Sequence, residues 1–397
     1  MKTVALKYVP LKEVCLDFIV PQRDKPKTFD GDIPWCRIED IEGRYLNRSK
    51  SGQKVSKDLA DKMNMHLCPK GTVISACSAS IGNQAITTID CYTNQTFIGL
   101  VVNPRLLYNV YLFYFLESQT KNLMDLGQGA TIKYISKDKY KKMLIPLPSL
   151  SEQQRIVDIL DAEFEKIDRL RSNAEQNLRH AKDLFQAALR KELEPKEGWE
   201  TITLQEFFDI TSSKRVFQSD WKKDGVPFYR AREIVKLSKN GHVDNDLFIT
   251  PEMYDAYKKK YGVPKIGDIL ITGVGTLGVC YLVSNNNPFY FKDGNVIWLK
   301  KTKEISSEYV VLTFLSDDVQ KQVHSTQGAV VGTYTIEKAK STIISIPKTL
   351  QKQEAIVSVL NNLNAKCKVL QDNYTKTIAL CDDLKQALLR KAFNGEL

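Results

Sequence analysis

One glycine-rich motif has the spacing of a nucleotide-binding loop but lacks the element that must follow it. Gly273, Gly275 and Gly278 fit the GxGxxG pattern. In a dinucleotide-binding loop the glycines lead into a helix whose N-terminus faces the pyrophosphate. Here they lead into Val279–Val283, an apolar run that is typical of a strand. We therefore interpret the motif as a hairpin turn.

A second motif and the scattered histidines and cysteines do not form a catalytic or metal-binding set. Asn287–Tyr290 reads NPFY, which differs from the NPPY motif of amino-methyltransferases, and no FxGxG loop stands upstream. The sequence contains no Walker loop, HExxH or GxSxG motif. The residues nearest to a zinc set are His66, Cys68, Cys77 and Cys91. Their spacing is a poor match to zinc ligands, so we expect reduced thiols, no metal site and no catalytic centre.

Basic and polar side chains near aromatic residues are the remaining candidates. One group follows Trp35 and another follows Phe228 and Tyr229, at matching places in the two halves of the chain. Such side chains reach base edges and phosphates, although an ordinary solvated surface contains them too. With a glutamine that recurs in a QGA triplet of each half, the candidate DNA-binding residues are Arg37, Arg44, Arg48, Lys50, Lys54, Gln128, Arg230, Arg232, Lys236, Lys239 and Gln327.

Composition favours a polyanionic partner and argues against a membrane protein. The chain has 397 residues and a net charge of +10. Residues 1–148 contain 21 Lys and Arg against 14 Asp and Glu, although charge alone is equally compatible with a solvated surface. Apolar stretches such as Leu106–Leu116 are too short to cross a bilayer, and the N-terminus lacks a signal-peptide core. We therefore expect a cytoplasmic protein.

The elements that carry these side chains come from an internal repeat. Leu189–Lys191 returns as Leu389–Lys391, at an offset of 200. Ile145–Pro148 likewise corresponds to Ile344–Pro347. The globular parts repeat more loosely, with Ile33–Arg37 matching Val226–Arg230, Gly71 matching Gly267 and Gly82 matching Gly278. The order globule, helix, globule, helix indicates a common framework that carries divergent globules.

Each half ends in a long amphipathic segment with heptad spacing. In the first, apolar residues alternate at steps of three and four, and Arg171 interrupts the series. Such a seam predicts a helix packed along another helix, although a helix on its own globule would show a similar stripe. Two matched segments favour mutual pairing. The seam and partner-docking candidates are Leu160, Phe164, Ile167, Leu178, Phe185, Leu360, Leu363, Leu370, Ile378, Leu384 and Leu388.

The globules combine short strands with helical patterns. Apolar or β-branched runs predict strands at Gly71–Ile74, Gln95–Val102 and Gly267–Ile271, and three-to-four spacing predicts helices at Leu106–Asn122 and Ser307–Val323. The predicted fold class is mixed α/β, in two copies joined by two long antiparallel coiled-coil helices with pseudo-two-fold symmetry. The predicted parts are residues 1–148, a helical spacer at 149–194, residues 195–347 and a second spacer at 348–397.

Over nearly its whole length the chain resembles the specificity subunits of Type I restriction–modification systems. The strongest marks are IPLPSLSEQQRIVDIL at Ile145–Leu160, PKEGWE at Pro195–Glu200 and ALLRKAFNGEL at Ala387–Leu397. Weaker marks are GDILITGVGTLG at Gly267–Gly278 and QGATIKYIS at Gln128–Ser136. The second Leu-Pro of the first helical entry, Leu147–Pro148, is only partly kept as Ile346–Pro347, a small departure from the pattern.

The resemblance implies two target-recognition domains, each of which reads one half of a split site in double-stranded DNA. The two helices would form an antiparallel coiled coil that sets the distance between these domains. The expected partners are two methyltransferase subunits, which use S-adenosylmethionine, and motor–nuclease restriction subunits, which use ATP and Mg²⁺. This chain itself would hold no cofactor.

Two other classes remain as alternatives at this point. One is a self-contained methyltransferase or nuclease, against which the missing cofactor loop argues. The other is a scaffold that pairs proteins through coiled coils without touching DNA. Salt-dependent binding to duplex DNA distinguishes that scaffold from a DNA-reading subunit.

Overall fold

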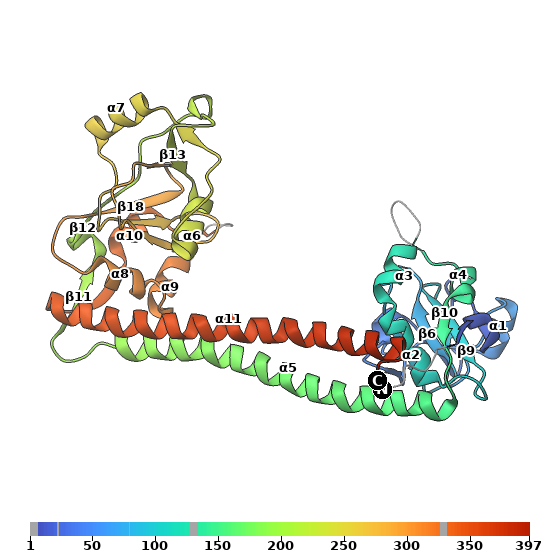
Figure 1. The fold of residues 1–397 in the computed structure, drawn as a ribbon. Coiled ribbons are helices and arrows are strands. Elements are labelled where there is room, and N and C mark those ends of the chain that lie inside the picture. Colours follow the sequence, from blue (N-terminus) through green and yellow to red (C-terminus); the bar gives the residue numbers. More distant parts are fainter. Residues whose placement is uncertain (1–6, 22–23, 79, 128–133, 326–331) are drawn as a thin grey trace. The chain divides into compact units, whose positions relative to one another are not determined.

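The computed structural model describes residues 7–21, 24–78, 80–127, 134–325 and 332–397. The chain divides into two compact units. Unit 1 contains Met1–Glu175 and Thr375–Leu397, and unit 2 contains Gln176–Tyr374. Each unit thus has one globular region and a part of each of the two long helices, coloured green and red in Figure 1. The domain boundaries proposed from the sequence stay a prediction.

Unit 1 is a mixed α/β unit with three small sheets. Their strand orders are β2-β9-β6-β7-β4, β5-β3-β8 and β1-β10. The globular elements are β1 (Tyr8–Pro10), β2 (Cys15–Ile19), β3 (Ile33–Cys36), β4 (Tyr45–Leu46), β5 (Lys54–Val55), α1 (Lys57–Lys62), β6 (Val73–Ala76), β7 (Gln84–Thr87), β8 (Tyr92–Thr93), β9 (Phe97–Val102), α2 (Asn109–Ser118), α3 (Thr120–Leu126), α4 (Lys137–Lys142) and β10 (Leu144–Pro146).

Unit 2 repeats this plan, except that the described residues of its largest sheet form four strands, without a counterpart of β4. Its sheets have the orders β12-β18-β15-β16, β14-β13-β17 and β11-β19. The globular elements are β11 (Trp199–Thr203), β12 (Phe208–Thr211), β13 (Val226–Tyr229), α6 (Ala231–Asn240), β14 (Phe248–Ile249), α7 (Pro251–Tyr261), β15 (Ile269–Thr272), β16 (Cys280–Leu282), β17 (Tyr290–Phe291), β18 (Val296–Lys301), α8 (Ser307–Thr313), α9 (Asp317–His324), α10 (Ile336–Ser341) and β19 (Ile343–Pro347).

The glycine-rich motif is a hairpin turn, as the sequence predicts. β15 and β16 pair in antiparallel register, with Ile269 opposite Leu282. Gly275 and Gly278 both have φ of 71°, a left-handed conformation that favours glycine. A Cβ at Gly278 would lie 2.9 Å from a methyl group of Val323 on α9, so the turn also packs closely on that helix.

Equivalent buried glutamines show that the framework is repeated at the level of single hydrogen bonds. Gln153 accepts a hydrogen bond from the backbone N–H of Tyr108, and its side-chain amide donates to the carbonyl of Pro148. Gln353 accepts from the N–H of Ser306 and donates to the carbonyl of Pro347. Each glutamine satisfies backbone groups at the place where a long helix meets its globule.

The two long helices are α5 (Leu150–Leu193) and α11 (Leu350–Asn394). In unit 1 they run antiparallel, because Asp168 pairs with Lys385 at 2.6 Å and Arg171 pairs with Asp382. Of the predicted seam, Leu160, Phe164, Ile167 and Leu360 are buried, while Leu178, Phe185, Leu363, Ile378 and Leu388 are partly buried. No helix among the described residues is long and apolar enough to cross a membrane.

Candidate nucleic-acid interface

A small sheet in unit 2 supports a surface remote from the long helices. β14-β13-β17 and α7 enclose their own apolar cluster, which contains Phe228, Ile249, Tyr254 and Tyr290. Figure 1 shows α7 at one end of this unit, whereas α8 and α9 lie at the end where the long helices are. The side chains around α7 therefore lie away from the long helices.

Basic side chains and aromatic rings lie close together on this surface, which we call the lysine–aromatic surface. Its exposed members are Lys214, Arg215, Phe217, Lys258, Lys259, Lys260 and Tyr261. The ammonium groups of Lys214 and Lys260 lie 5.6 and 5.3 Å from the ring centroid of Tyr261. The hydroxyl of Tyr257 donates to the carbonyl of Arg215 at 3.1 Å and joins α7 to the preceding loop. Basic groups held beside rings are typical of nucleic-acid surfaces.

Unit 1 has a smaller counterpart around the sheet β5-β3-β8. The ammonium of Lys25 lies 5.6 Å from the ring centroid of Phe29 and 5.7 Å from that of Trp35. Arg37, which the sequence analysis selected, lies 5.6 Å from the Trp35 ring and pairs with Glu39 at 3.0 Å. Both units thus place cations beside aromatic rings near the equivalent sheet, on β3 in unit 1 and on α7 in unit 2.

Two of the candidates in unit 2 are held by acidic neighbours. Arg230 and Arg232 both pair with Glu233 and Asp246. Burial alone would raise the pKa of Glu233, but hydrogen bonds from the two arginines lower it below its ordinary value. The hydrogen bond from Arg232 likewise lowers the pKa of Asp246. The guanidinium groups are therefore arranged by the protein itself, and contact with DNA would have to share or break these pairs.

Lys236 and Lys239 lie in a different environment. Both are exposed on α6, and neither forms an ion pair with a described residue. The QGA glutamines, Gln128 and Gln327, lie outside the described residues.

The candidates of unit 1 likewise include both exposed side chains and side chains held by acidic partners. Arg48 and Lys54 are exposed, and Lys50 is exposed but pairs with Glu42 at 3.0 Å. Arg44 instead turns toward α5 and α2, where it bonds to Asp161 at 3.0 Å and to the hydroxyl of Tyr114.

The hydrogen bonds of Arg44 join the globular region of unit 1 to α5. Burial alone would raise the pKa of Asp161, but hydrogen bonds from Arg44 and Tyr114 lower it. This places Arg44 between its globule and α5, with Arg48, Lys50 and Lys54 as its more exposed neighbours.

Lys25, Lys214, Arg215 and the three consecutive lysines of α7 are not among the residues predicted from the sequence. The signal for the last group was present, since Lys258–Tyr261 is a run of three lysines followed by an aromatic residue. Its relevance depends on α7 lying beside the loop that carries Lys214 and Arg215, which only the folded structure reveals.

Exposed leucines recur at equivalent places on the long helices. Leu170 and Leu184 of α5 are 51% and 50% exposed, and Leu370 and Leu384 of α11 are 39% and 47% exposed. The repeat offset of 200 relates Leu170 to Leu370 and Leu184 to Leu384. Leu370 and Leu384 therefore lie beside the buried seam in the structure, and not in it as the sequence pattern predicts.

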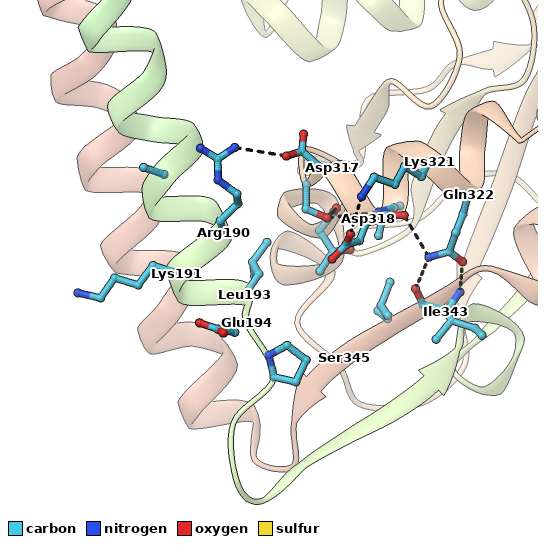
Figure 2. Close-up of a pocket in the computed structure, with 16 residues that line it drawn as sticks. Arg190, Lys191, Leu193, Glu194, Asp317, Asp318, Lys321, Gln322, Ile343 and Ser345 are labelled. Carbon is cyan, nitrogen blue, oxygen red and sulfur yellow. Dashed lines mark hydrogen bonds and ion pairs between the residues drawn. The ribbon is translucent and has the colours of Figure 1, made fainter.

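Unit 2 also contains a cavity of about 740 Å³ beside the end of α5. Figure 2 shows its lining, where Arg190 and Asp317 form an ion pair at 3.3 Å and Gln322 bonds to the backbone of Ile343. Its residue types suggest neither a metal nor a nucleophilic site, and no metal-binding cluster occurs among the described residues.

The chain contains two copies of one α/β framework, each continued by a long helix. Residues 6–178 and 196–378 both match the Type I restriction modification DNA specificity domain. The chain belongs to this family, and its role is DNA sequence specificity in type I restriction–modification.

Relatives agree with this assignment, and solved structures share the fold. The chain is 25% identical to the MjaIX specificity subunit of Methanocaldococcus jannaschii, covering 92% of this chain and 87% of that protein. It is 24% identical to the EcoKI specificity subunit of Escherichia coli, covering 93% and 83%. The fold is similar to the HsdS subunit from Thermoanaerobacter tengcongensis, with a TM-score of 0.61, 20% identity, and coverage of 98% and 97%. A chain of a type I R-M system has a TM-score of 0.78 at 21% identity, with full coverage of both chains.

Proposed function

We propose that each globular region is a target-recognition domain that reads one half of a split DNA site. The observation that carries this proposal is the contrast between a repeated interior and divergent exteriors. The buried glutamines recur, and so do the sheet orders apart from the edge strand β4 of unit 1. By contrast, the lysine–aromatic surface of unit 2 and the smaller Lys25–Trp35 group of unit 1 differ in composition. Different side chains on one scaffold would read different base pairs.

A domain exchange tests this proposal. Residues 1–148 are replaced by the corresponding residues of a relative, and methylated bases are mapped across the host genome by long-read sequencing. We expect one half-site to change and the other to stay the same. A change in both halves would contradict independent reading, and loss of all sequence preference would contradict the role of the domain.

The repeated exposed leucines support the docking of two copies of one partner, for which we propose the methyltransferase subunit. In unit 1, Leu170 and Leu384 are next to Arg171 and Lys385, whose ion pairs join the two helices. The equivalent positions in unit 2 are Leu370 and Leu184, next to Gln371 and Phe185, so the leucines recur although the flanking charges do not. Exposed apolar residues kept in this way suit a protein interface.

Alanine pairs test the docking sites. The double variant Leu170→Ala and Leu384→Ala should leave a complex with one methyltransferase subunit in place of two, as measured by native mass spectrometry. The pair Leu184→Ala and Leu370→Ala should have the same effect. Leu380→Ala is the matched control, because Leu380 is 63% exposed on α11 but its equivalent is His180. Full occupancy in both double variants would exclude these leucines as the docking sites.

We further propose that the helices set the spacer between the half-sites. Four added residues lengthen a helix by ~6 Å and rotate it by a net ~40°, whereas one or two added base pairs lengthen DNA by ~3.4–6.8 Å. Inserting four residues after Ser172 and after Asp372 should therefore keep both half-sites and lengthen the spacer by one or two base pairs. An active variant with the original spacer would show that the helices do not set it.

The catalytic steps belong, in this proposal, to partner subunits. S-adenosylmethionine would be bound by the methyltransferase subunits, and ATP and Mg²⁺ by the motor–nuclease subunits. The purified chain should then neither methylate nor cleave DNA. Methyl transfer from S-adenosylmethionine by a preparation free of partner subunits would contradict this division of labour.

A further inference from the structure

Phe217 is an exposed aromatic side chain in a loop whose backbone is fixed. Its side chain is 63% exposed, whereas its neighbour Val216 is buried in the cluster beneath. The backbone N–H of Phe217 donates to Asp220 at 3.2 Å, and that of Lys214 donates to the hydroxyl of Tyr290 at 2.9 Å. Hydrogen bonds thus hold the loop backbone on both sides of the ring. Binding of a ligand would therefore cost the loop little conformational entropy.

The charges around Phe217 identify the class of molecule that would cover it. Lys214, Arg215, Lys222 and Lys223 lie within the same ten residues, which contain one acid, Asp220. Arg215 pairs with Asp293 at 3.0 Å, so the three lysines carry most of the positive charge. The lysines of α7 extend this positive surface through the contacts of Tyr257 and Tyr261. An apolar protein surface would have to desolvate these cations, whereas the phosphates of duplex DNA would neutralise them.

A cavity beside the ring supplies a polar complement. It has a volume of about 400 Å³ and is lined by Arg215–Gln218, Trp221 and Lys292–Asn295. The indole N–H of Trp221 is buried and has no hydrogen-bond partner among the described residues. The ammonium of Lys292 lies 5.8 Å from the Trp221 ring centroid. An unpaired donor and a cation next to an exposed ring suit a ligand that combines acceptor atoms with an apolar surface, as base pairs do.

We propose that Phe217 contacts base pairs of the half-site read by unit 2 and determines the preference at one position of it. The contact is apolar, either with a thymine methyl group in the major groove or with a base step that the ring wedges open. This inference rests on the proposed function, because it assumes that unit 2 reads a half-site.

The described residues of unit 1 do not repeat this feature. The aromatic residue of its equivalent loop, Phe29, packs against Trp35 with ring centroids 5.2 Å apart and is partly buried. The proposed contact therefore concerns one half-site only, which distinguishes it from a general DNA-binding surface.

Binding measurements on the complex of this chain with its methyltransferase subunits test the inference. Affinity is measured for a duplex with the mapped site and for a random duplex, over a range of salt concentrations. Phe217→Ala should weaken binding to the site roughly 10- to 100-fold, with little change on random duplex and no change in the salt slope. Lys259→Ala should instead weaken binding to both duplexes and reduce the salt slope by about one.

Leu315→Ala is the matched control, since Leu315 is 43% exposed between α8 and α9, away from α7. It should bind as the wild type does. Replacing each thymine of the half-site by uracil detects a methyl contact, and 2-aminopurine fluorescence at each step detects a wedge. In either case the signal should depend on Phe217.

Equal losses on both duplexes, or no loss on either, would overturn the inference. So would intact discrimination together with weaker assembly of the methyltransferase subunits, which would assign Phe217 to a protein interface. These failures leave the proposed function in place. By contrast, a wild-type complex that binds the mapped site no better than random DNA would contradict the proposed function itself.

Discussion

The ends of the two long helices differ, although the helices come from one repeated sequence. In unit 1 the ring of Phe393 packs between Tyr111 and Phe115, with centroid distances of 5.0 and 5.5 Å. In unit 2 the repeat offset places Leu193 at the position of Phe393. There Leu193 and Thr313 line the cavity of about 740 Å³ that Figure 2 shows, in place of a filled core.

Hydrogen bonds establish which residues correspond. The hydroxyl of Tyr111 donates to the carbonyl of Pro146, and that of Tyr309 donates to the carbonyl of Ser345, the equivalent residue. Tyr111 therefore matches Tyr309, so that Phe115 matches Thr313. Two of the three rings in the unit 1 contact, Phe393 and Phe115, are thus replaced in unit 2 by smaller side chains, Leu193 and Thr313. The comparison teaches that the hydrogen-bonded framework was kept while the packing at the helix ends diverged.

The largest expected effect comes from removing the Phe393 ring, which packs in the core of unit 1. Phe393→Ala should lower the free energy of unfolding by ~3–5 kcal/mol, because it leaves a cavity against Tyr111 and Phe115. Hydrogen–deuterium exchange should show faster exchange in the last turns of α11. Leu193→Ala, at the partly exposed equivalent, should cost only about 1 kcal/mol. Equal losses in the two variants would contradict the difference in packing.

The buried glutamines should show the opposite pattern, with similar losses in both units. Gln153→Ala and Gln353→Ala each leave backbone groups without a partner, at a cost of ~2 kcal/mol. Urea unfolding of the two variants measures this cost. A loss confined to one variant would mean that the repeated hydrogen bonds do not support the two units alike.

The ion pair of Arg44 with Asp161 is present in unit 1 only, because position 361 is Asn. Asp161→Asn should lower stability at pH 7 by ~0.5–1 kcal/mol, since the carboxylate is partly exposed. The pKa of Asp161 is lowered in the folded protein, so this stabilisation is fully present above the ordinary value of 3.8. It is lost as pH falls through the lowered pKa.

Unfolding of the wild type and of Asp161→Asn from pH 7 to pH 3 measures this dependence. The difference between the two proteins should stay constant down to about pH 4 and then shrink. A difference that persists unchanged at the lowest pH would assign the effect to packing and not to charge.

Much of the framework could be predicted from the sequence because it depends on local patterns. The heptad spacing predicted both long helices, and Gly275 and Gly278 predicted the β15–β16 turn. The predicted helix at Leu106–Asn122 is instead the two helices α2 and α3, with a break at Gln119. Apolar periodicity continues across this break, so spacing alone could not locate it.

The side chains of the candidate site were harder to predict, because their partners are distant in the chain. Arg44 and Asp161 are 117 residues apart, and nothing in the stretch around Arg44 indicates a bond to a helix. Arg230 and Glu233 are close in sequence, but the second partner of Arg230, Asp246, is brought to it by the turn of the chain after α6. Leu370 and Leu384 differ from the seam by one position, an error of about 100° around the helix.

The smallest expected effect concerns the exposed ion pair of Arg171 and Asp382, which joins α5 to α11 in unit 1. Asp382→Asn should lower stability by only ~0.2–0.5 kcal/mol at low salt, because both groups are solvated and the pair is screened. The loss should disappear at about 1 M salt, where the screening length is about 3 Å. Asp383→Asn is the control, since this exposed neighbour forms no ion pair with a described residue. The repeat offset of 200 places Lys182 at the position of Asp382 and Gln371 at the position of Arg171. Unit 2 therefore has no counterpart of this ion pair. A salt-independent loss of stability above 1 kcal/mol would mean that the charges and the seam together hold the helices in unit 1. The difference between the two units would then extend from the helix ends into the coiled coil itself.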